Sequence, residues 1–325
     1  MKCSLNGLKK YIELSENADQ VAKMLTAIGL EVEGQETIQN IKGGLKGVVT
    51  GQVVTCTKHP DADKLSVTTV DIGLDEHQQI VCGAPNVAVG QKVLVATVGT
   101  TLYPSGGEAL TIKKAKIRGV ESNGMICAAD ELGLGDDHSG ILVLAADTKV
   151  GLPASDLYEI YEDTLYEIGL TPNRSDATCH LGVARDLYAY IRANVDNSRT
   201  FNEPGTSGFN VENHTLEIKV EVNKPDLCPR YSGLTISGIK VGPSPAWLQN
   251  HLQVLGVKPI NNVVDATNYI LHDLGQPLHA FDADKIGGST IVVDTLTSGT
   301  QFLALDGRAF TLKGEELMIC DASGR

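Results

Sequence analysis

The 325-residue chain lacks the signals that would place it in a membrane or outside the cell. It has no run of roughly 18 or more uncharged apolar residues, and its opening stretch, MKCSLNGLKKYIEL, carries lysines but no apolar h-region. Its 7 cysteines are odd in number, scattered and without a C-x-x-C pair, which argues against a disulfide framework and a thiolate zinc site. We therefore expect a cytoplasmic protein with reduced, mostly buried thiols.

Common catalytic motifs are also missing. The sequence contains no G-x-x-x-x-G-K-[ST] phosphate loop and no G-x-S-x-G nucleophile elbow. Its 8 histidines form no H-x-x-x-H or H-E-x-x-H pair, so the pattern does not support a metallohydrolase. We expect no metal site in this chain.

Negative charge is plentiful, with a formal net charge of −13, but it is unevenly spread. Residues 41–150 hold 10 basic and 12 acidic side chains, whereas residues 151–325 hold 13 and 22. No acid lies between Glu108 and Glu121, where the segment TIKKAKIRG supplies several cations. Because the local potential decides whether phosphate is attracted, overall acidity does not exclude a nucleic acid ligand.

This basic segment predicts a stripe of positive charge. If residues 112–118 form a strand, Lys114, Lys116 and Arg118 project from one face, because side chains alternate along a strand. The alternative is that these cations only keep a solvated strand edge soluble. The pattern alone leaves both interpretations open.

Hydrophobic spacing predicts helix first and strands afterwards. The first 35 residues have helical spacing, with Val21 and Leu25 on one apolar stripe and Gly29 as a stop. Ser15 and Asn17 are candidate caps for this helix. From residue 48 to residue 145 the period changes to two in several short segments, which predicts a closed or nearly closed β-barrel.

The rest of the chain predicts a return to helix and then a second mixed region. Residues 175–195 have helical spacing, and residues 197–214 are rich in Asn, Ser, Gly and Pro, as in a loop. Further on, we expect strands at 215–223, 231–241, 289–296 and 302–312, the last with a hairpin turn at Asp306-Gly307, and helices at 244–256 and 263–275.

The expected fold class is therefore α+β and multidomain. An α-rich mixed domain, residues 1–40 plus 152–196, is split by an inserted barrel at residues 41–151. A mixed α/β domain follows over residues 211–325. The sequence stops directly after a strand-like segment, LMIC, so we expect this last domain to be truncated.

Three segments of the expected barrel resemble a known module. HPDADKLSVTTVDIG at 59–73, IVCGAPNV at 80–87 and KIRGVESNGMICAADELGL at 116–134 are similar to the tRNA-binding OB-fold domain. An OB-fold presents a strand face and loops to nucleic acid, with cations along the backbone.

This resemblance implies phosphate contacts from four cations: Lys64, Lys114, Lys116 and Arg118. It also implies that Asn86 either structures its turn or touches a base. Ala128 stands where the module usually has serine, so one hydroxyl contact is missing.

The chain as a whole resembles the N-terminal part of the beta subunit of bacterial phenylalanyl-tRNA synthetase. The segments that carry this resemblance, in order, are MKCSLNGLKKYIEL, the barrel, TPNRSDATCHLGVARDLYAY, CPRYSGLTISGIKV and DATNYILHDLGQPLHAFDADKI. The family implies binding of tRNA(Phe), hydrolytic editing of tyrosyl-tRNA(Phe) by the B3/B4 domain, and an alpha-subunit partner in an (αβ)₂ heterotetramer. The sequence lacks a class II nucleotide-binding signature, so the resemblance assigns ATP and Mg²⁺ to the alpha subunit.

Matching the editing motifs residue by residue points to three positions. Thr267 of TNY and His279 of PLHAFD fall at editing-pocket positions, where hydrogen bonds would orient water or the ester. Lys258 stands where some relatives carry arginine, which keeps the charge but loses the bidentate fork. The family's glutamate that recognises the tyrosine hydroxyl would lie beyond Arg325, so we expect that this segment does not edit alone.

Less specific interpretations stay open beside these. His279 could be only a turn residue satisfied by backbone, and the other histidines weighed are read as structural: His59, His138, His180, His251 and His272. Two other functions also remain possible, a stand-alone tRNA-binding protein and a free trans-editing factor.

Overall fold

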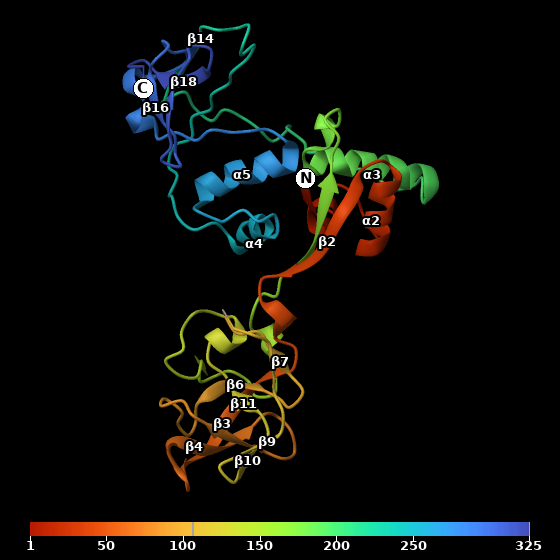
Figure 1. Ribbon diagram of the computed structural model, residues 1–325, viewed down its shortest axis with the longest axis vertical. Helices are drawn as coiled ribbons and strands as arrows, with labels where there is room; N and C mark the ends of the chain where they lie inside the picture. The colour runs from red at the N-terminus through yellow and green to blue at the C-terminus, as the bar shows by residue number, and fades with distance from the viewer. Residues whose placement is uncertain (106, 325) are drawn as a thin grey trace.

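The computed structural model describes residues 1–105 and 107–324. Figure 1 shows an upper region that contains both termini and a separate lower unit, joined by two strands that run side by side. None of the helices in the described part of the chain is both long and apolar enough to cross a bilayer.

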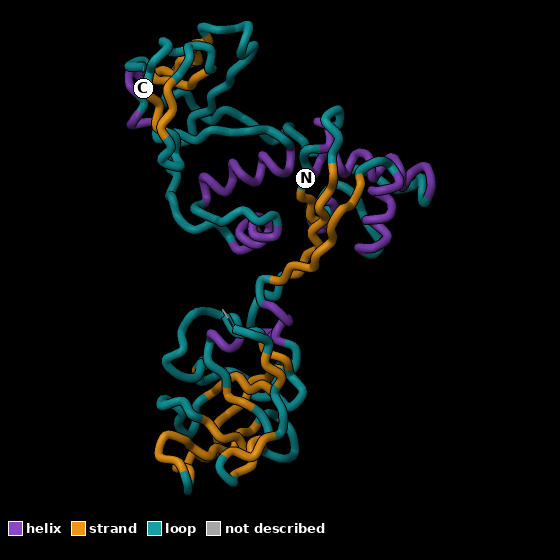
Figure 2. The backbone as a smooth tube through the Cα atoms, viewed as in Figure 1, coloured by secondary structure: helices purple, strands orange, loops and turns teal. Residues whose placement is uncertain are grey.

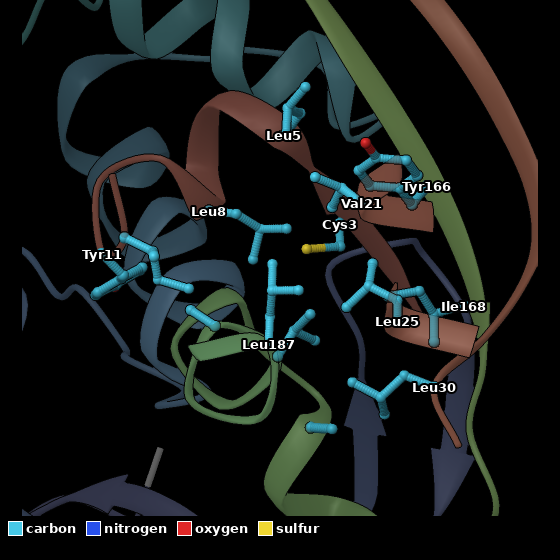
Figure 3. Packing of buried hydrophobic residues seen from close by; sticks show 14 of the residues in the cluster. Cys3, Leu5, Leu8, Tyr11, Val21, Leu25, Leu30, Tyr166, Ile168 and Leu187 are labelled. Carbon is cyan, nitrogen blue, oxygen red and sulfur yellow. The ribbon is translucent and has the colours of Figure 1, made fainter. Parts of the chain in front are cut away.

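The first sheet of the upper region combines residues from both sides of the lower unit. It has the antiparallel order β1-β13-β2, with β1 at Lys2–Ser4, β13 at Glu162–Gly169 and β2 at Glu31–Gln39. Three helices accompany it, α1 (Leu5–Leu8), α2 (Ala18–Ala27) and α3 (His180–Asn194). Apolar side chains from these elements form one buried core, shown in Figure 3, which includes Cys3, Leu8, Val21, Leu25, Tyr166 and Leu187.

Only part of the predicted N-terminal helix forms. Asn17, rather than Ser15, caps α2: its side chain accepts from the Gln20 N–H at 3.0 Å, and the Gln20 side chain accepts from the Asn17 N–H at 2.9 Å. The helix ends before Gly29, whose φ of 83° suits glycine. The residues that follow the predicted stop pair with β13 as strand β2, so the helical spacing predicted for the first 35 residues extends too far.

Asn40 fastens the two connecting strands where the lower unit begins. Its backbone N–H donates to the Tyr161 carbonyl at 3.1 Å, and its side-chain amide donates to the Glu159 carbonyl at 2.8 Å. The Asn40 Oδ1 in turn accepts from the Tyr161 N–H at 2.8 Å. The chain therefore enters and leaves the lower unit at one point.

The lower unit is built around a single curved sheet. Its strand order is β11-β6-β3-β4-β5, and β12 also pairs with β6. The strands are β3 (Val48–His59), β4 (Ala62–Asp71), β5 (Gln78–Cys82), β6 (Lys92–Ala96), β11 (Met125–Ile126) and β12 (Val143–Leu144). Two small hairpins complete it, β7 (Thr101–Leu102) with β8 (Leu110–Thr111), and β9 (Ala115–Ile117) with β10 (Val120–Ser122).

Hydrogen bonds bring the edge strand β5 against the end of β10. The Val81 N–H donates to Ser122 Oγ at 3.1 Å, and the Asn123 N–H donates to the Gln79 carbonyl at 2.8 Å. The sheet is therefore a nearly closed barrel, which confirms that part of the prediction.

The C-terminal region contains a second small sheet and a hairpin. β14 (Lys219–Val222) is parallel to β15 (Thr290–Thr295), which is antiparallel to β18 (Leu317–Asp321). The hairpin joins β16 (Gln301–Leu303) to β17 (Ala309–Thr311). The strand predicted at 215–223 is thus shorter than expected.

The strand predicted at 231–241 is absent from the described structure, and Figure 2 shows this stretch as loop. Alternating apolar side chains such as Leu234 and Ile236 are exposed. The Thr235 hydroxyl donates to the Leu216 carbonyl at 2.7 Å. A β-prone pattern needs a paired neighbour to become a strand, and this segment has none among the described residues.

Helices α4 (Ala246–Val254) and α5 (Asn262–Leu274) form where the spacing predicts them. Asn261 caps α5 by accepting from two backbone N–H groups, and Gly275, with φ 75°, ends it. Val254 and Leu255 pack against Leu165 of β13. The two helices therefore lie against the first sheet and α3, as Figure 1 shows.

Candidate nucleic-acid interface and editing region

The predicted cationic strand is wrong over most of its length. Only Ala115–Ile117 of this segment is strand, as β9, and residues 112–114 lie outside any strand. Arg118 and Gly119 form the two-residue turn to β10, with φ 43° and 88°. A flat stripe therefore does not form, because the chain reverses at the last of the cations.

The four predicted phosphate contacts are all exposed but differ in their partners. Lys114 Nζ forms an ion pair with Glu121 Oε2 at 3.2 Å. Arg118 donates through a terminal guanidinium nitrogen to the Asp61 carbonyl at 3.2 Å. Lys64, on β4, and Lys116, on β9, have no ion-pair partner within the described residues. The structure thus offers two unpaired ammonium groups and one guanidinium held by a neutral acceptor.

The Asn86 side chain is hydrogen-bonded twice to the loop before β12. Its side-chain amide donates to the Ile141 carbonyl at 3.0 Å, and its Oδ1 accepts from the Ile141 N–H at 2.9 Å. Its own carbonyl accepts from the Gln91 side chain at 2.9 Å. The turn after β5 is therefore fixed to the loop before β12, and a base contact by this amide would compete with those bonds.

The β3–β4 turn and the β9–β10 hairpin touch each other through a histidine. His59 is buried and hydrogen-bonds both to Asp61 of the turn and to Ile117 of the hairpin. Sequence reasoning treated His59 only as structural. Its contact with a residue 58 positions away has no sequence signal beyond its place in the HPDADKL motif.

The three predicted editing residues lie on and beside α5 without joining one another. The Thr267 hydroxyl, half-buried on the helix, donates to the Val264 carbonyl at 2.7 Å. Lys258 and His279 are exposed, and the His279 ring lies 6.3 Å from that of Phe281. Within the described residues no hydrogen bond links any two of the three.

A cluster of three histidines, His180, His251 and His272, joins α4 and α5 to the first sheet. His180, with no exposed surface, accepts from the Ser4 N–H at Nε2 over 2.9 Å and faces the His272 carbonyl from Nδ1 at 2.9 Å. Because Nε2 accepts, the proton of the neutral ring lies on Nδ1 and is donated to that carbonyl. The His251 ring is 5.4 Å from the His180 ring.

Electrostatics in this cluster favour uncharged rings. Burial, then the nearby charges of Lys10, His180 and His272, lower the pKa of His251 to about 3. Burial also lowers the pKa of His180, His272 and Lys10. The Lys10 ammonium nevertheless keeps partners, since it donates to the Tyr269 hydroxyl at 2.9 Å and lies 4.5 Å from the centroid of that ring.

Two family models match the chain. The "Putative tRNA binding domain" matches residues 48–153, which include the barrel and its basic hairpin, and the "B3/4 domain" matches residues 227–325, which include α4 and α5. One chain therefore carries matches to both a tRNA-binding domain and a B3/4 domain.

Its relatives define the family more narrowly. The chain is 54% identical, over 321 residues, to the phenylalanine–tRNA ligase beta subunit of Bacteroides thetaiotaomicron, 50% identical over 326 residues to that of Porphyromonas gingivalis, and 45% identical over 332 residues to that of Salinibacter ruber. The matches cover 99–100% of this chain and 39% of each relative. The chain is thus similar over nearly its whole length to these phenylalanine–tRNA ligase beta subunits, and it spans 39% of their length.

Proposed function

We propose that the protein serves as the beta subunit of a phenylalanine–tRNA ligase, where it binds tRNA(Phe) and hydrolyses tyrosyl-tRNA(Phe). One observation carries this proposal: 54% identity through 99% of the chain to a protein named as that subunit. Both matched domains occur within the same chain, which favours this function over a stand-alone tRNA-binding protein or a free trans-editing factor. Such a subunit would act in the cytoplasm.

The domain division that we propose follows the sequence. Residues 1–40 plus 152–196 make one α-rich mixed domain, residues 41–151 an inserted OB-fold, and residues 211–325 a mixed B3/B4 domain. The sheet formed by β1, β2 and β13 supports the split first domain. The hydrogen bonds between Asn40 and Tyr161 support an inserted second one. In this proposal the barrel docks the tRNA and the B3/B4 region acts on its aminoacyl end.

For tRNA binding we propose a surface formed by Lys64, Lys114, Lys116 and Arg118, with Asn86 as a supporting residue. Exposed cations on neighbouring strands and turns can follow a phosphate backbone even on an acidic protein, because binding releases counterions from the nucleic acid. Two of these cations have no acidic partner among the described residues. They would need to break no ion pair before meeting a phosphate.

For editing we propose roles for Thr267, His279 and Lys258. A synthetic pocket for phenylalanine discriminates poorly against a ring that merely adds a hydroxyl, with selectivity stalling at about 10²-fold, so a second site is needed. The exposed His279 ring and the Thr267 hydroxyl have the chemistry to orient water or the ester. Lys258 supplies a positive charge for the ribose-phosphate end.

Aminoacylation itself is assigned to a partner. Among the described residues, no three His, Cys, Asp or Glu side chains gather into a metal site. As the family resemblance implies, the proposal assigns ATP and Mg²⁺ to the alpha subunit, within an (αβ)₂ heterotetramer.

Co-purification tests the assignment. Tagged full-length protein isolated from its own cells should bring down, in equal amount, a smaller protein with class II synthetase motifs. The pair should charge tRNA(Phe) with phenylalanine and deacylate tyrosyl-tRNA(Phe). Recovery of a lone monomer that binds tRNA would refute the ligase proposal and favour a stand-alone binding protein or editing factor.

Charge reversal tests the proposed tRNA surface. Changing Lys114, Lys116 and Arg118 to Glu should weaken tRNA binding by at least roughly tenfold at low salt and flatten the salt dependence by about one power per lost contact. The matched control reverses three exposed lysines outside the barrel with the same change in net charge, namely Lys219, Lys240 and Lys313. Equal affinity of the two triple variants would rule out this surface.

A further inference from the structure

His59 uses both of its ring nitrogens to hold two different loops. It ends β3 and is 5% exposed. The Asp61 N–H donates to its Nδ1 at 3.0 Å, and its Nε2 faces the Ile117 carbonyl at 3.1 Å. Because Nδ1 accepts, the neutral ring carries its proton on Nε2 and donates it to that carbonyl. One buried side chain thus connects the β3–β4 turn to the β9–β10 hairpin.

The hairpin tip is held in a conformation that its own sequence does not favour. Ile117 pairs with Val120, so Arg118 and Gly119 are the central residues of the turn, and both have positive φ. Such a turn suits Asn or Gly at its first position, and a positive φ is uncommon for arginine. The bond from Arg118 to the Asp61 carbonyl, at 3.2 Å, is a second tie between the tip and the β3–β4 turn.

Without His59, the hairpin tip would be held mainly by its hydrogen bonds to β5. There the Gln79 side chain donates to the Glu121 carbonyl at 2.8 Å, and Ser122 bonds to β5. Glu121 is already paired with Lys114. A free tip would let its cations turn toward such carboxylates, whereas a fixed tip keeps them available and lowers the entropy lost on binding phosphate.

We propose that His59 is a positioning residue for tRNA binding, which aligns the β3–β4 turn and the β9–β10 hairpin so that Lys64, Lys116 and Arg118 meet the phosphate backbone together. The inference rests on the proposed tRNA-binding function. His59 does not touch the RNA in this account, because it lies beneath the loops. It acts through the backbone of Ile117 and of Asp61, whose carbonyl accepts from the Arg118 side chain.

Two conservative substitutions of His59 each keep only one of the two hydrogen bonds made by its ring. In His59→Asn the amide oxygen takes the place of Nδ1 and can accept from the N–H two residues on, as in an Asx-turn, but the side chain is too short to reach Ile117. In His59→Gln the longer amide takes the place of Nε2 and can still donate to the Ile117 carbonyl. His59→Asn should weaken binding of a tRNA(Phe) transcript by about fivefold at low salt, and His59→Gln by less than about twofold.

His77 supplies the matched control, since it is an exposed histidine of the same barrel. His77→Gln should leave the affinity unchanged. The double variant His59→Asn/Arg118→Gln should lose less binding free energy than the sum of the losses of the two single variants, because the histidine acts partly through that arginine. Equal affinities of His59→Asn, His59→Gln and unmodified protein, alongside a weakened charge-reversal variant, would overturn the inference and leave the binding surface intact.

The other outcomes are equally decisive. If charge reversal of the hairpin has no effect on tRNA binding, the proposed surface and the role of His59 fail together. If His59→Asn does not fold, the unmodified chain provides the test by amide hydrogen exchange. Saturating tRNA should slow exchange at the Asp61 N–H, which bonds to the ring, and unchanged exchange there would overturn the inference.

Discussion

Acid should loosen the contact between α4 and the first sheet, and His251 allows the effect to be calculated. This residue is 3% exposed, and its Nε2 has no hydrogen-bond partner among the described residues. Its folded pKa of about 3 lies below the ordinary histidine value of about 6.5. Between these two pH values the unfolded chain therefore binds one more proton at this site than the folded chain.

The sign and size of the effect follow from this difference. The stabilising contribution of neutral His251 is complete above pH 6.5 and is lost as pH falls toward 3, at up to about 1.4 kcal/mol per pH unit. At pH 5 the free energy of unfolding should have decreased by about 2 kcal/mol from this residue alone. The lowered pKa values of His180 and His272 act in the same direction.

The assay is urea unfolding of the 325-residue chain from pH 7.5 to pH 5, followed by tryptophan fluorescence. Trp247 is the only tryptophan of the chain and lies on α4, with its ring 5.6 Å from that of Tyr269. In His251→Met the dependence of unfolding free energy on pH should be shallower by about one proton, whatever the variant's stability at pH 7.5. His77→Gln, in an exposed loop, is the control. Parallel pH profiles for His251→Met and unmodified protein would refute the reasoning.

Three further predictions concern other parts of the molecule. In the complete heterotetramer, His279→Ala should slow deacylation of tyrosyl-tRNA(Phe) by at least roughly tenfold and leave phenylalanylation near normal, and unchanged deacylation would remove His279 from the site. Asn17→Ala should lower the free energy of unfolding by about 1 kcal/mol, measured by urea titration, because α2 loses its capping box. Asn17→Asp should keep most of the stability that this cap provides. Gly182→Ala should destabilise the chain more than Ala184→Gly, since a Cβ at Gly182 would lie 1.8 Å from the Asp176 carbonyl oxygen in the turn before α3; equal unfolding midpoints would contradict this.

Local signals predicted the elements that depend on local contacts. α2 and α5 carry their own caps, Asn17 and Asn261, and end at glycines with positive φ, so each helix is visible from its own residues. The long barrel strands β3 and β4 follow one another and pair directly, which the period of two could indicate.

The predictions from sequence were wrong where a strand pairs with a partner far along the chain, or where a turn decides the local geometry. β2 has a mixed pattern that became a strand only because β13 lies beside it, far along the chain. The basic segment alternates in sequence, yet Arg118 and Gly119 reverse the chain before a stripe can form. The same limit hid the role of His59, since its partner carbonyl belongs to that hairpin.

The hydrogen bonds of Asn40 to Tyr161 and Glu159 have a consequence for how the protein could have evolved. Because Asn40 and Tyr161, which flank the lower unit, are hydrogen-bonded to each other, a short turn could replace the whole unit without disturbing the first sheet. An ancestral protein could therefore have gained or lost the barrel as one inserted domain in a single recombination event. The domain that contains the first sheet could still fold in either case.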